Sequence, residues 1–256
     1  MIIYGTDLAF LKGKLVRKRP GSIQEIQQIP LTKTIFDHHQ KIHLSMDNMY
    51  VQNIAMLLSH EESFKYRILF STHKKKANKK ESLESVKKTL NKYQARGGLT
   101  VVQINADNEF ECIHANIRPT TLSIVAEEEH VDSIERAIRT NKGDTRAHIH
   151  RLPYTHYPIS MAERAQKHSV IRRNNLPALN GASPDISPEK LITGLPPPDY
   201  KEVIKLNFGD YVQTYEGVTK TTNKSRYIGA IALYPSSNCT GSWYFMSLLT
   251  GKKIHK

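Results

Sequence analysis

The chain has 256 residues, 39% of them hydrophobic, which is enough for one sizeable core or a core with a small second domain and excludes a peptide or a disordered tail. Its 37 lysines and arginines exceed its 24 aspartates and glutamates, so the formal net charge is +13 and the pI is about 9.6. Such an excess favours a polyanionic partner, nucleic acid first, although it also fits a protein that its charge only keeps soluble.

Cysteine usage and hydropathy narrow the class further. Cys112 and Cys239 lie far apart and form no CxxC pair, which argues against a disulfide framework and a cysteine-based zinc site. Gly5, Asp7 and Lys12 interrupt the N-terminal segment before a signal-like apolar stretch develops, and no segment reaches membrane-spanning length. We therefore expect a soluble protein of a reducing compartment, without a membrane partner.

The first third of the chain predicts strands after a basic lead-in. Residues 1–40 mix basic residues with prolines and show little periodicity. Alternating apolar residues over 41–58 predict two consecutive strands, and residues 64–72 predict a third. The lysine-rich segment 73–80 is typical of a solvated loop, although lysines along a nucleic-acid path would have the same composition.

The middle of the chain combines helices and strands. Residues 81–98 have a stripe of apolar residues on one helical face, and residues 99–104 predict an apolar strand that runs toward Asp107. We expect a further strand over 121–126 and a helix over 127–142, whose N-terminal glutamates are favoured by the helix dipole. The predicted order is three strands, a helix, two strands and a helix.

The last part of the chain has a different composition. Residues 160–175 predict one more helix, and residues 176–203 carry many prolines without any period, which indicates a linker. Residues 204–256 contain three short apolar strands separated by turn residues and predict a small all-β module. With the lead-in set apart, the core domain is expected to span residues 41–175.

Three carboxylates occupy particular places in this order: Asp47 inside the first strand, Asp107 at the end of the fourth, and Glu135 on the helix after the fifth. An acid inside a strand is unfavourable unless its charge is compensated, because desolvating a charge costs several kcal/mol. If the first and fourth strands are neighbours, the two aspartates converge, and a helix packed on the sheet can bring Glu135 to them. Such all-oxygen ligation suits two magnesium or manganese ions, about 4 Å apart, in a phosphoryl displacement.

Eight short sequence segments follow one another along nearly the whole chain. They are "IYGTDLAFLKGKLVRK", "MDNMYV", "DNEFE", "EHVDSIERAIRT", "TRAHIHRLPY", "LITGLPPPDYK", "FGDYVQTYE" and "WYFMSLLTGKKI". Asp107 lies 60 residues after Asp47, and Glu135 lies 28 residues after Asp107. These segments resemble the integrase region of copia-type retrotransposon polyproteins. The predicted order of strands and helices resembles the ribonuclease-H-like fold of the retroviral integrase superfamily.

The resemblance implies an α/β, ribonuclease-H-like core with a five-stranded mixed sheet flanked by helices, followed by the small all-β module. It implies that Asp47, Asp107 and Glu135 are catalytic acids that bind two Mg²⁺ or Mn²⁺ ions, and no zinc is expected. Element ends and target DNA would be the partners of a homo-oligomer that acts in the nucleus after a stage in a cytoplasmic particle.

The resemblance also implies where DNA is held. A basic residue that contacts the DNA end corresponds to Lys142, which lies two helical turns after Glu135 and on the same face. The lead-in, the lysine loop and the β module would hold DNA mainly through its phosphates. The expected DNA-binding side chains are Lys142, Arg139, Lys74, Lys75 and Lys76.

Other interpretations of the acids stay open. Asp47 could cap a bulge, Asp107 could start a turn, and Glu135 could pair with Arg139 at i+4 on a helix surface. The neighbouring Glu109 and Glu111 fit surface acids better than metal ligands.

Two further groups invite a functional interpretation. The spacing of His39 and His43, next to His38, suggests zinc, but the absence of any CxxC disfavours it. The aromatic run 243–245 could stack on bases, or it could lie half in a core and half on a surface, as is usual in a β module.

Two positions depart from the resemblance. Asn48 stands beside Asp47 in place of an apolar residue, and burying an unpaired amide costs about 1–3 kcal/mol. Gly143 and Asp144 are expected to interrupt the helix after Glu135, where a glycine costs about 1 kcal/mol. Three functions follow: an integrase, acting as polynucleotidyl transferase and endonuclease; a catalytically silent nucleic-acid-binding fragment of a decayed element; and a metal nuclease of the same fold.

Overall fold

The computed structural model describes residues 27–72, 78–125, 131–195, 205–215, 223, 225–238 and 241–256. The chain forms two compact units, one spanning residues 26–197 and the other including residues 198–256. Several predicted features lie outside the described residues: lead-in residues 1–26, the three lysines Lys74, Lys75 and Lys76, the glutamates at 127–129, and linker residues 196–204.

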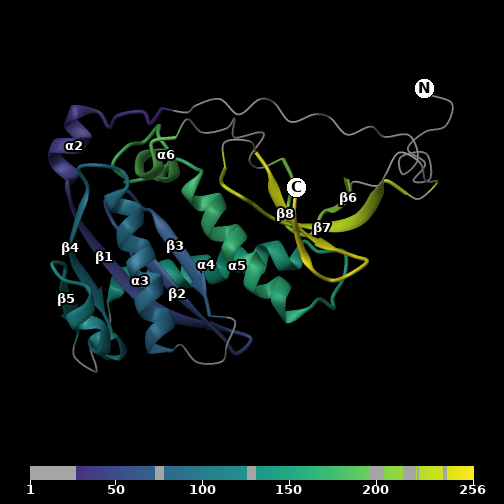
Figure 1. The fold of residues 1–256 in the computed structure, drawn as a ribbon, viewed down its shortest axis with the longest axis horizontal. Helices are drawn as coiled ribbons and strands as arrows, with labels where there is room; N and C mark the ends of the chain where they lie inside the picture. The colour runs from purple at the N-terminus through teal and green to yellow at the C-terminus, as the bar shows by residue number, and fades with distance from the viewer. Residues whose placement is uncertain are drawn as a thin grey trace. The chain divides into compact units, whose positions relative to one another are not determined.

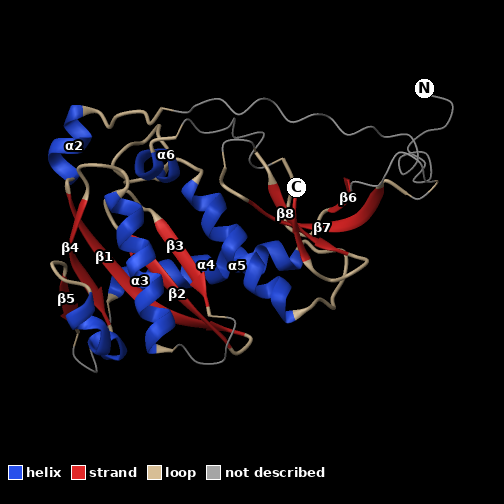
Figure 2. Ribbon diagram, in the orientation of Figure 1, coloured by secondary structure: helices blue, strands red, loops and turns tan. Residues whose placement is uncertain are grey.

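A five-stranded mixed sheet forms the centre of the larger unit (Figures 1 and 2). Its order is β3-β2-β1-β4-β5; the β1–β2 and β2–β3 pairs are antiparallel, and β4 runs parallel to both β1 and β5. Gln52 and Asn53, both with positive φ, join β1 to β2 in the two-residue turn that suits a twisted hairpin. The strands are β1 (Lys41–Val51), β2 (Ile54–Glu61), β3 (Arg67–Ser71), β4 (Thr100–Ala106) and β5 (Thr121–Ile124).

Helices cover both faces of this sheet. Their bounds are α2 (Lys33–His39), α3 (Lys79–Gln94), α4 (Asp132–His150), α5 (Ile159–Asn174) and α6 (Pro188–Thr193), and a 3-10 helix, η1 (Asn108–Asn116), follows β4. The stretch after Asp107, for which the sequence predicted no helix, is therefore this 3-10 helix.

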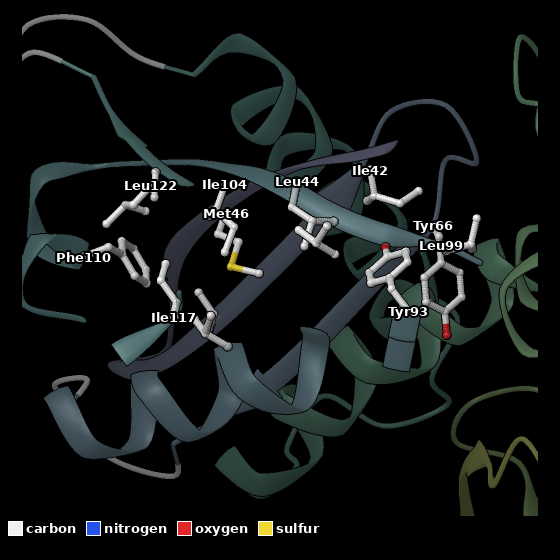
Figure 3. Close-up of a cluster of buried hydrophobic side chains, with 14 of the residues drawn as sticks. Ile42, Leu44, Met46, Tyr66, Tyr93, Leu99, Ile104, Phe110, Ile117 and Leu122 are labelled. Atoms are coloured by element: carbon white, nitrogen blue, oxygen red, sulfur yellow. The ribbon is translucent and has the colours of Figure 1, made fainter. Parts of the chain in front are cut away.

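One face of the sheet packs against α3. Ile42, Leu44 and Met46 of β1 are fully buried in a cluster with Val86 and Tyr93 of α3. Figure 3 shows part of this cluster, with the side chains of β1 and β4 beside those of Phe110, Ile117 and Leu122. The helical stripe predicted for residues 81–98 is therefore confirmed as the core face of α3.

The other face of the sheet packs against α4 and α5. Met49 of β1 lies in a second cluster with Ile134 of α4 and Val170 of α5. Ser45, four residues before Met49, accepts a hydrogen bond from Ser133 of α4 at 2.8 Å between the two Oγ atoms. Successive side chains of a strand alternate between its faces, so Asp47, which lies between these two residues, belongs to the α4 face as well.

The predicted interruption of α4 at Gly143 and Asp144 is wrong, because the helix continues through both residues to His150. Gly143 lies on the exposed side, where a side chain would meet no neighbour within 4 Å, so its absence leaves no cavity. Asp144 accepts two hydrogen bonds from Arg173 of α5, at 2.5 and 3.0 Å. Contacts with α5 offset the cost of about 1 kcal/mol that a glycine imposes on a helix interior.

Buried polar contacts also join α4 to α5. The Asn141 amide donates to Gln166 at 2.6 Å, and the Thr145 and Ser169 hydroxyls lie 2.9 Å apart, with all four residues buried. Because a buried polar group without a partner costs about 1–3 kcal/mol, these pairs fix the register between the two helices.

Parts of the predicted lead-in and linker pack onto the larger unit, which extends beyond the expected range 41–175. Arg96, which is 8% exposed, donates to the carbonyls of Leu191 in α6 and Ile29, at 2.8 and 2.6 Å. Leu191 and Ile192 are themselves buried in the α3 cluster. Gly194 ends α6 with φ +66°, and a Cβ there would lie 2.3 Å from Arg96, so this position requires glycine.

The C-terminal unit contains a four-stranded antiparallel sheet in the order β6-β7-β8-β9. Its strands are β6 (Tyr211–Tyr215), β7 (Tyr227–Pro235), β8 (Trp243–Ser247) and β9 (Lys253–His255), and the last of these was not predicted. Trp243 and Phe245 are buried with Ala230 and Ala232. Tyr244 is only half-buried, and its ring stacks on His255 at 4.6 Å between centroids. The predicted five-stranded mixed sheet flanked by helices, followed by a small all-β module, is confirmed.

Asn174, at the end of α5, fixes that helix to the edge strand β3. Its side chain accepts a hydrogen bond from the backbone N–H of Arg67 at 3.0 Å and donates to the carbonyl of the same residue at 2.7 Å. The side chain is only 3% exposed, so water does not replace it. One amide thus satisfies both backbone groups at this point of the sheet edge.

Asn174→Ala is expected to lower the free energy of unfolding by about 2–3 kcal/mol, because two backbone groups lose their partner. Urea denaturation followed by circular dichroism measures this change. Asn175→Ala is the control: its amide donates only to Ile171 within its own helix, at 2.9 Å, and a loss of under about 1 kcal/mol is expected. Equal losses in the two variants would contradict the role of Asn174 at the sheet edge.

Candidate active site

The parallel pairing of β1 and β4 brings Asp47 and Asp107 to matching positions. Met46 of β1 pairs with Ala106, the last residue of β4; Asp47 follows Met46 within β1, and Asp107 directly follows Ala106 in extended backbone. Neighbouring strands lie about 4.8 Å apart, and residues at matched positions point to the same face. The structure therefore places the two predicted acids side by side.

The strand residues before these acids are polar as well. Ser45 pairs with Asn105, which accepts a hydrogen bond from Gln103 at 2.7 Å. Gln103 and Asn105 are spaced by two and so share one face of β4, and the extended Asp107 continues this spacing just past the strand. A polar strip therefore runs along the α4 face of two central strands and ends at the two aspartates.

The electrostatic setting of Asp47 reflects the other acids. Burial raises the pKa of Asp47 from its ordinary 3.8 to about 6, and the charge on Asp107 contributes most among its neighbours, ahead of Glu109 and Glu135. The backbone N–H of Asn48 donates to the Asp47 carboxylate at 2.6 Å and acts in the opposite direction. Four carboxylates from β1, η1, α4 and the end of β4 thus act on one place.

Asn48 and Glu109 are linked across this site. The Asn48 amide donates to a Glu109 carboxylate oxygen at 2.6 Å, while the Asn48 Oδ1 atom is buried without a hydrogen-bond partner in the described part of the chain. The hydrogen bond to Glu109 therefore offsets only part of the free-energy cost of burying the Asn48 amide. The sequence predicted Glu109 as a surface acid; it is exposed, yet its charge also raises the pKa of Asp47.

The remaining predicted residues of the site lie on α4. Glu135, in its first turn, and Lys142, two turns later, are both half-buried, whereas Arg139 is exposed. Their spacing places Glu135 and Lys142 on the same side of the helix, about 10 Å apart along its axis.

An oxygen-only site of this kind suits a hard divalent cation. Asp47 and Asp107 fit such an ion, because burial and then the charge of Asp107 raise the pKa of Asp47, and a cation between the two carboxylates would oppose both effects. Within the described ranges, no three side chains of His, Cys, Asp or Glu lie together closely enough to hold a metal ion. Asp47 and Asp107 are neighbours at this site. Glu135 lies near enough for its charge to raise the pKa of Asp47, but it does not complete a cluster of three ligands.

The histidines near the start of β1 make other contacts. The His39 ring packs on Phe64 with 5.5 Å between centroids, and burial, followed by the charge of His38, lowers the pKa of His39. His43 is exposed on β1.

The chain is structurally similar to the catalytic cores of retroviral integrases. The core of BIV integrase is 14% identical, with a TM-score of 0.39 over 59% of this chain and 92% of the other. Two magnesium-bound structures of the HTLV-2 integrase core, dimeric and trimeric, are 13% and 12% identical, with TM-scores of 0.40 and 0.42 over 56% and 64% of this chain and 92% and 97% of theirs. At these identities the likeness assigns no activity.

No protein-family model and no curated protein matches the sequence. Among the helices that the structure describes, none has the length and apolar character needed to cross a membrane.

Asp47→Asn is expected to stabilise the metal-free protein at neutral pH and to have little effect in acid. Since the folded-state pKa is raised from 3.8 to about 6, the folded protein binds this proton more tightly than the unfolded chain. The stabilisation that this bound proton gives the folded protein is complete below pH about 4 and is lost as the pH rises through about 6. The variant should gain about 1–2 kcal/mol at pH 7.5, allowing for solvent screening.

Urea denaturation between pH 4 and pH 7.5, with a chelator present, measures this difference. Glu111→Gln, which removes an exposed acid of η1, is the control for the loss of one negative charge. A constant difference between Asp47→Asn and the parent protein at all pH values would contradict the raised pKa.

Proposed function

We propose that the chain is an integrase of a copia-type retrotransposon, which trims the ends of element DNA and joins the new 3′ hydroxyls to target DNA. The observation that supports this most is that the parallel register of β1 and β4 brings Asp47 and Asp107, the residue just after β4, together, on the sheet face that the helix of Glu135 covers. The order of the eight sequence segments that resemble copia-type integrases supports the same class of protein.

In this proposal Asp47 and Asp107 hold Mg²⁺ or Mn²⁺, and Glu135 approaches from the first turn of α4. Bound there, two such ions would activate the attacking oxygen and stabilise the leaving oxygen of a phosphodiester. The acids act as ligands and form no covalent intermediate. The half-buried setting strengthens their interaction with a cation, because the local dielectric is lower than that of water.

Basic residues would hold the DNA. Lys142 follows Glu135 on the same side of α4, where its ammonium group can bind a phosphate near the acids. Arg139 is exposed on the same helix and can bind the phosphate backbone. Lys74, Lys75 and Lys76 and the C-terminal unit complete the proposed set of DNA contacts. The joining of two DNA ends at once requires more than one copy, so we propose a homo-oligomer, with its action in the nucleus.

A catalytically silent nucleic-acid-binding fragment is the second candidate. It is favoured by one observation: Asp47, Asp107 and Glu135, all within the described residues, do not form a cluster that could hold a metal ion. A charge of +13 would still support DNA binding.

The purified protein is expected to join a labelled duplex that carries the element's terminal sequence to plasmid DNA when Mg²⁺ or Mn²⁺ is present. Asp107→Asn should reduce joining by about a hundredfold or more, because a metal ligand is lost. Gel electrophoresis separates joined products from nicked ones.

Glu111→Gln is the matched control for this assay, since it removes one carboxylate from η1 outside the proposed ligand set. Nicks without joined products would support a metal nuclease. DNA binding with neither product would support the silent fragment and contradict the proposed activity.

Divalent ions should also stabilise the protein directly. At a Mn²⁺ concentration of about ten times Kd, binding contributes about 1.4 kcal/mol, which corresponds to a rise in Tm of about 3–6 °C. Thermal unfolding should show this rise in the parent chain and in Glu111→Gln, and no rise in Asp47→Asn. An equal rise in Asp47→Asn would place the ion elsewhere.

A further inference from the structure

A second, basic site lies in a cavity of about 540 Å³ between β3, α4, α5 and the segment after α5. Its volume is within the range of small-molecule sites, about 300–1,000 Å³. None of the proposed catalytic acids lines it. Asp144, its nearest lining residue on α4, lies nine residues after Glu135, which is about 14 Å along the helix.

The charges around this cavity are almost all positive. Among its described lining residues, five are cationic, and Asp144 is the one acid. Asp144 accepts both hydrogen bonds of the Arg173 fork. The other four cations that line the cavity are Lys65, Arg67, Arg151 and Arg172.

Two of these arginines have unsatisfied groups. The Nη1 atoms of Arg67 and Arg172 are buried and find no hydrogen-bond partner in the described part of the chain. Burial, together with the charge of Arg173, lowers the pKa of Arg67 to about 10. Buried polar groups are nearly always satisfied in native proteins, so such donors indicate a ligand that completes them.

The fold holds these like charges together on rigid elements. Asn174 fixes the backbone of Arg67 to the end of α5, two residues after Arg172. The buried pairs between α4 and α5 fix α4, whose C-cap is Arg151, against the helix of Arg172. Holding cations this close opposes folding, and an anion in the cavity would remove that cost.

We propose that this cavity binds a compact polyphosphate, meaning two or more phosphate groups joined directly to one another. Guanidinium groups bind phosphate oxygens in a bidentate manner, and several of them around one cavity suit an anion of high charge density. The cations converge on one cavity from several elements and do not form a row along the surface, which favours such a compact group over the backbone of a duplex. This site is separate from the proposed DNA-joining activity and does not depend on it.

The test is calorimetric titration of the full chain with inorganic tripolyphosphate, and separately with ATP, at a salt concentration of about 0.3 M, where exposed charges are screened. Sulfate at equal ionic strength is the reference anion. Tripolyphosphate should bind, and Arg172→Gln and Lys65→Gln should each weaken binding by about tenfold or more. ATP that binds more tightly would identify the ligand as a nucleotide; otherwise the phosphates alone determine binding.

Arg146→Gln is the matched control, because it removes one exposed positive charge from the same stretch of α4 without lining the cavity. Its affinity should stay within about twofold of the parent chain, as expected for a screened surface charge. Asp107→Asn should also bind tripolyphosphate normally, so failure of the DNA-joining proposal and failure of this one are distinguishable. Unfolding curves verify that each variant is folded.

A second readout is the His148 ring, which lies beside the cavity. Burial lowers the pKa of His148, as do Arg172 of α5 and Arg151, while Asp144 raises it; its ring also meets His168 edge to face at 4.8 Å. Tripolyphosphate should raise this pKa, as measured by proton NMR, and a group that only packs in the fold would not respond.

Three results would overturn the proposal. One is binding of tripolyphosphate no tighter than that of sulfate. Another is an equal loss of affinity in Arg146→Gln and Arg172→Gln. The third is that Arg172→Gln weakens the binding of a short DNA duplex about tenfold and leaves tripolyphosphate binding unchanged, which would show that the cavity binds DNA.

Discussion

The parallel pairing of β1 with β4 is the constraint on which the rest of the larger unit depends. It aligns Met46 with Ala106, and that single register places two aspartates side by side. It also sends Ile42, Leu44 and Met46 into one core and leaves Ser45, Asp47 and Met49 facing α4. A shift of the register by one residue would exchange these two sets, burying the carboxylates beneath α3 and moving the apolar residues onto the polar face.

The helix α4 connects this strand pair to the rest of the fold. Its first turn carries Glu135 near the aspartates, and its last turns border the basic cavity. The helix dipole is positive at its first turn and negative at its last, so it favours the acids at one end and the cations at the other. Buried amide and hydroxyl contacts with α5 prevent α4 from rotating. The two ends therefore keep their distance and orientation, although they bear opposite charge.

The sequence predicts much of this arrangement and misses other parts for physical reasons. Periodicity identifies the strands and the core face of α3, since the spacing of apolar residues indicates which side chains are buried. It does not reveal that Arg96 binds Ile29 and Leu191, which brings segments that resemble lead-in and linker into the core. The proximity of Asp47 and Asp107 follows once the strands are assumed to be neighbours. The cavity formed by Lys65, Arg67, Arg151 and Arg172 has no local signal, because its members come from segments that only the fold brings together.

Asn174 has a consequence for the exposed edge of the sheet at β3. Edge strands with unpaired backbone groups attract further strands, and proteins protect such edges in several ways. Here a side-chain amide takes the place of an additional strand at Arg67, because it offers the same donor and acceptor as a peptide group. Another chain that extended the sheet through β3 would have to displace this buried amide together with the end of α5. Extension of the sheet by another chain is therefore disfavoured at this point of the β3 edge.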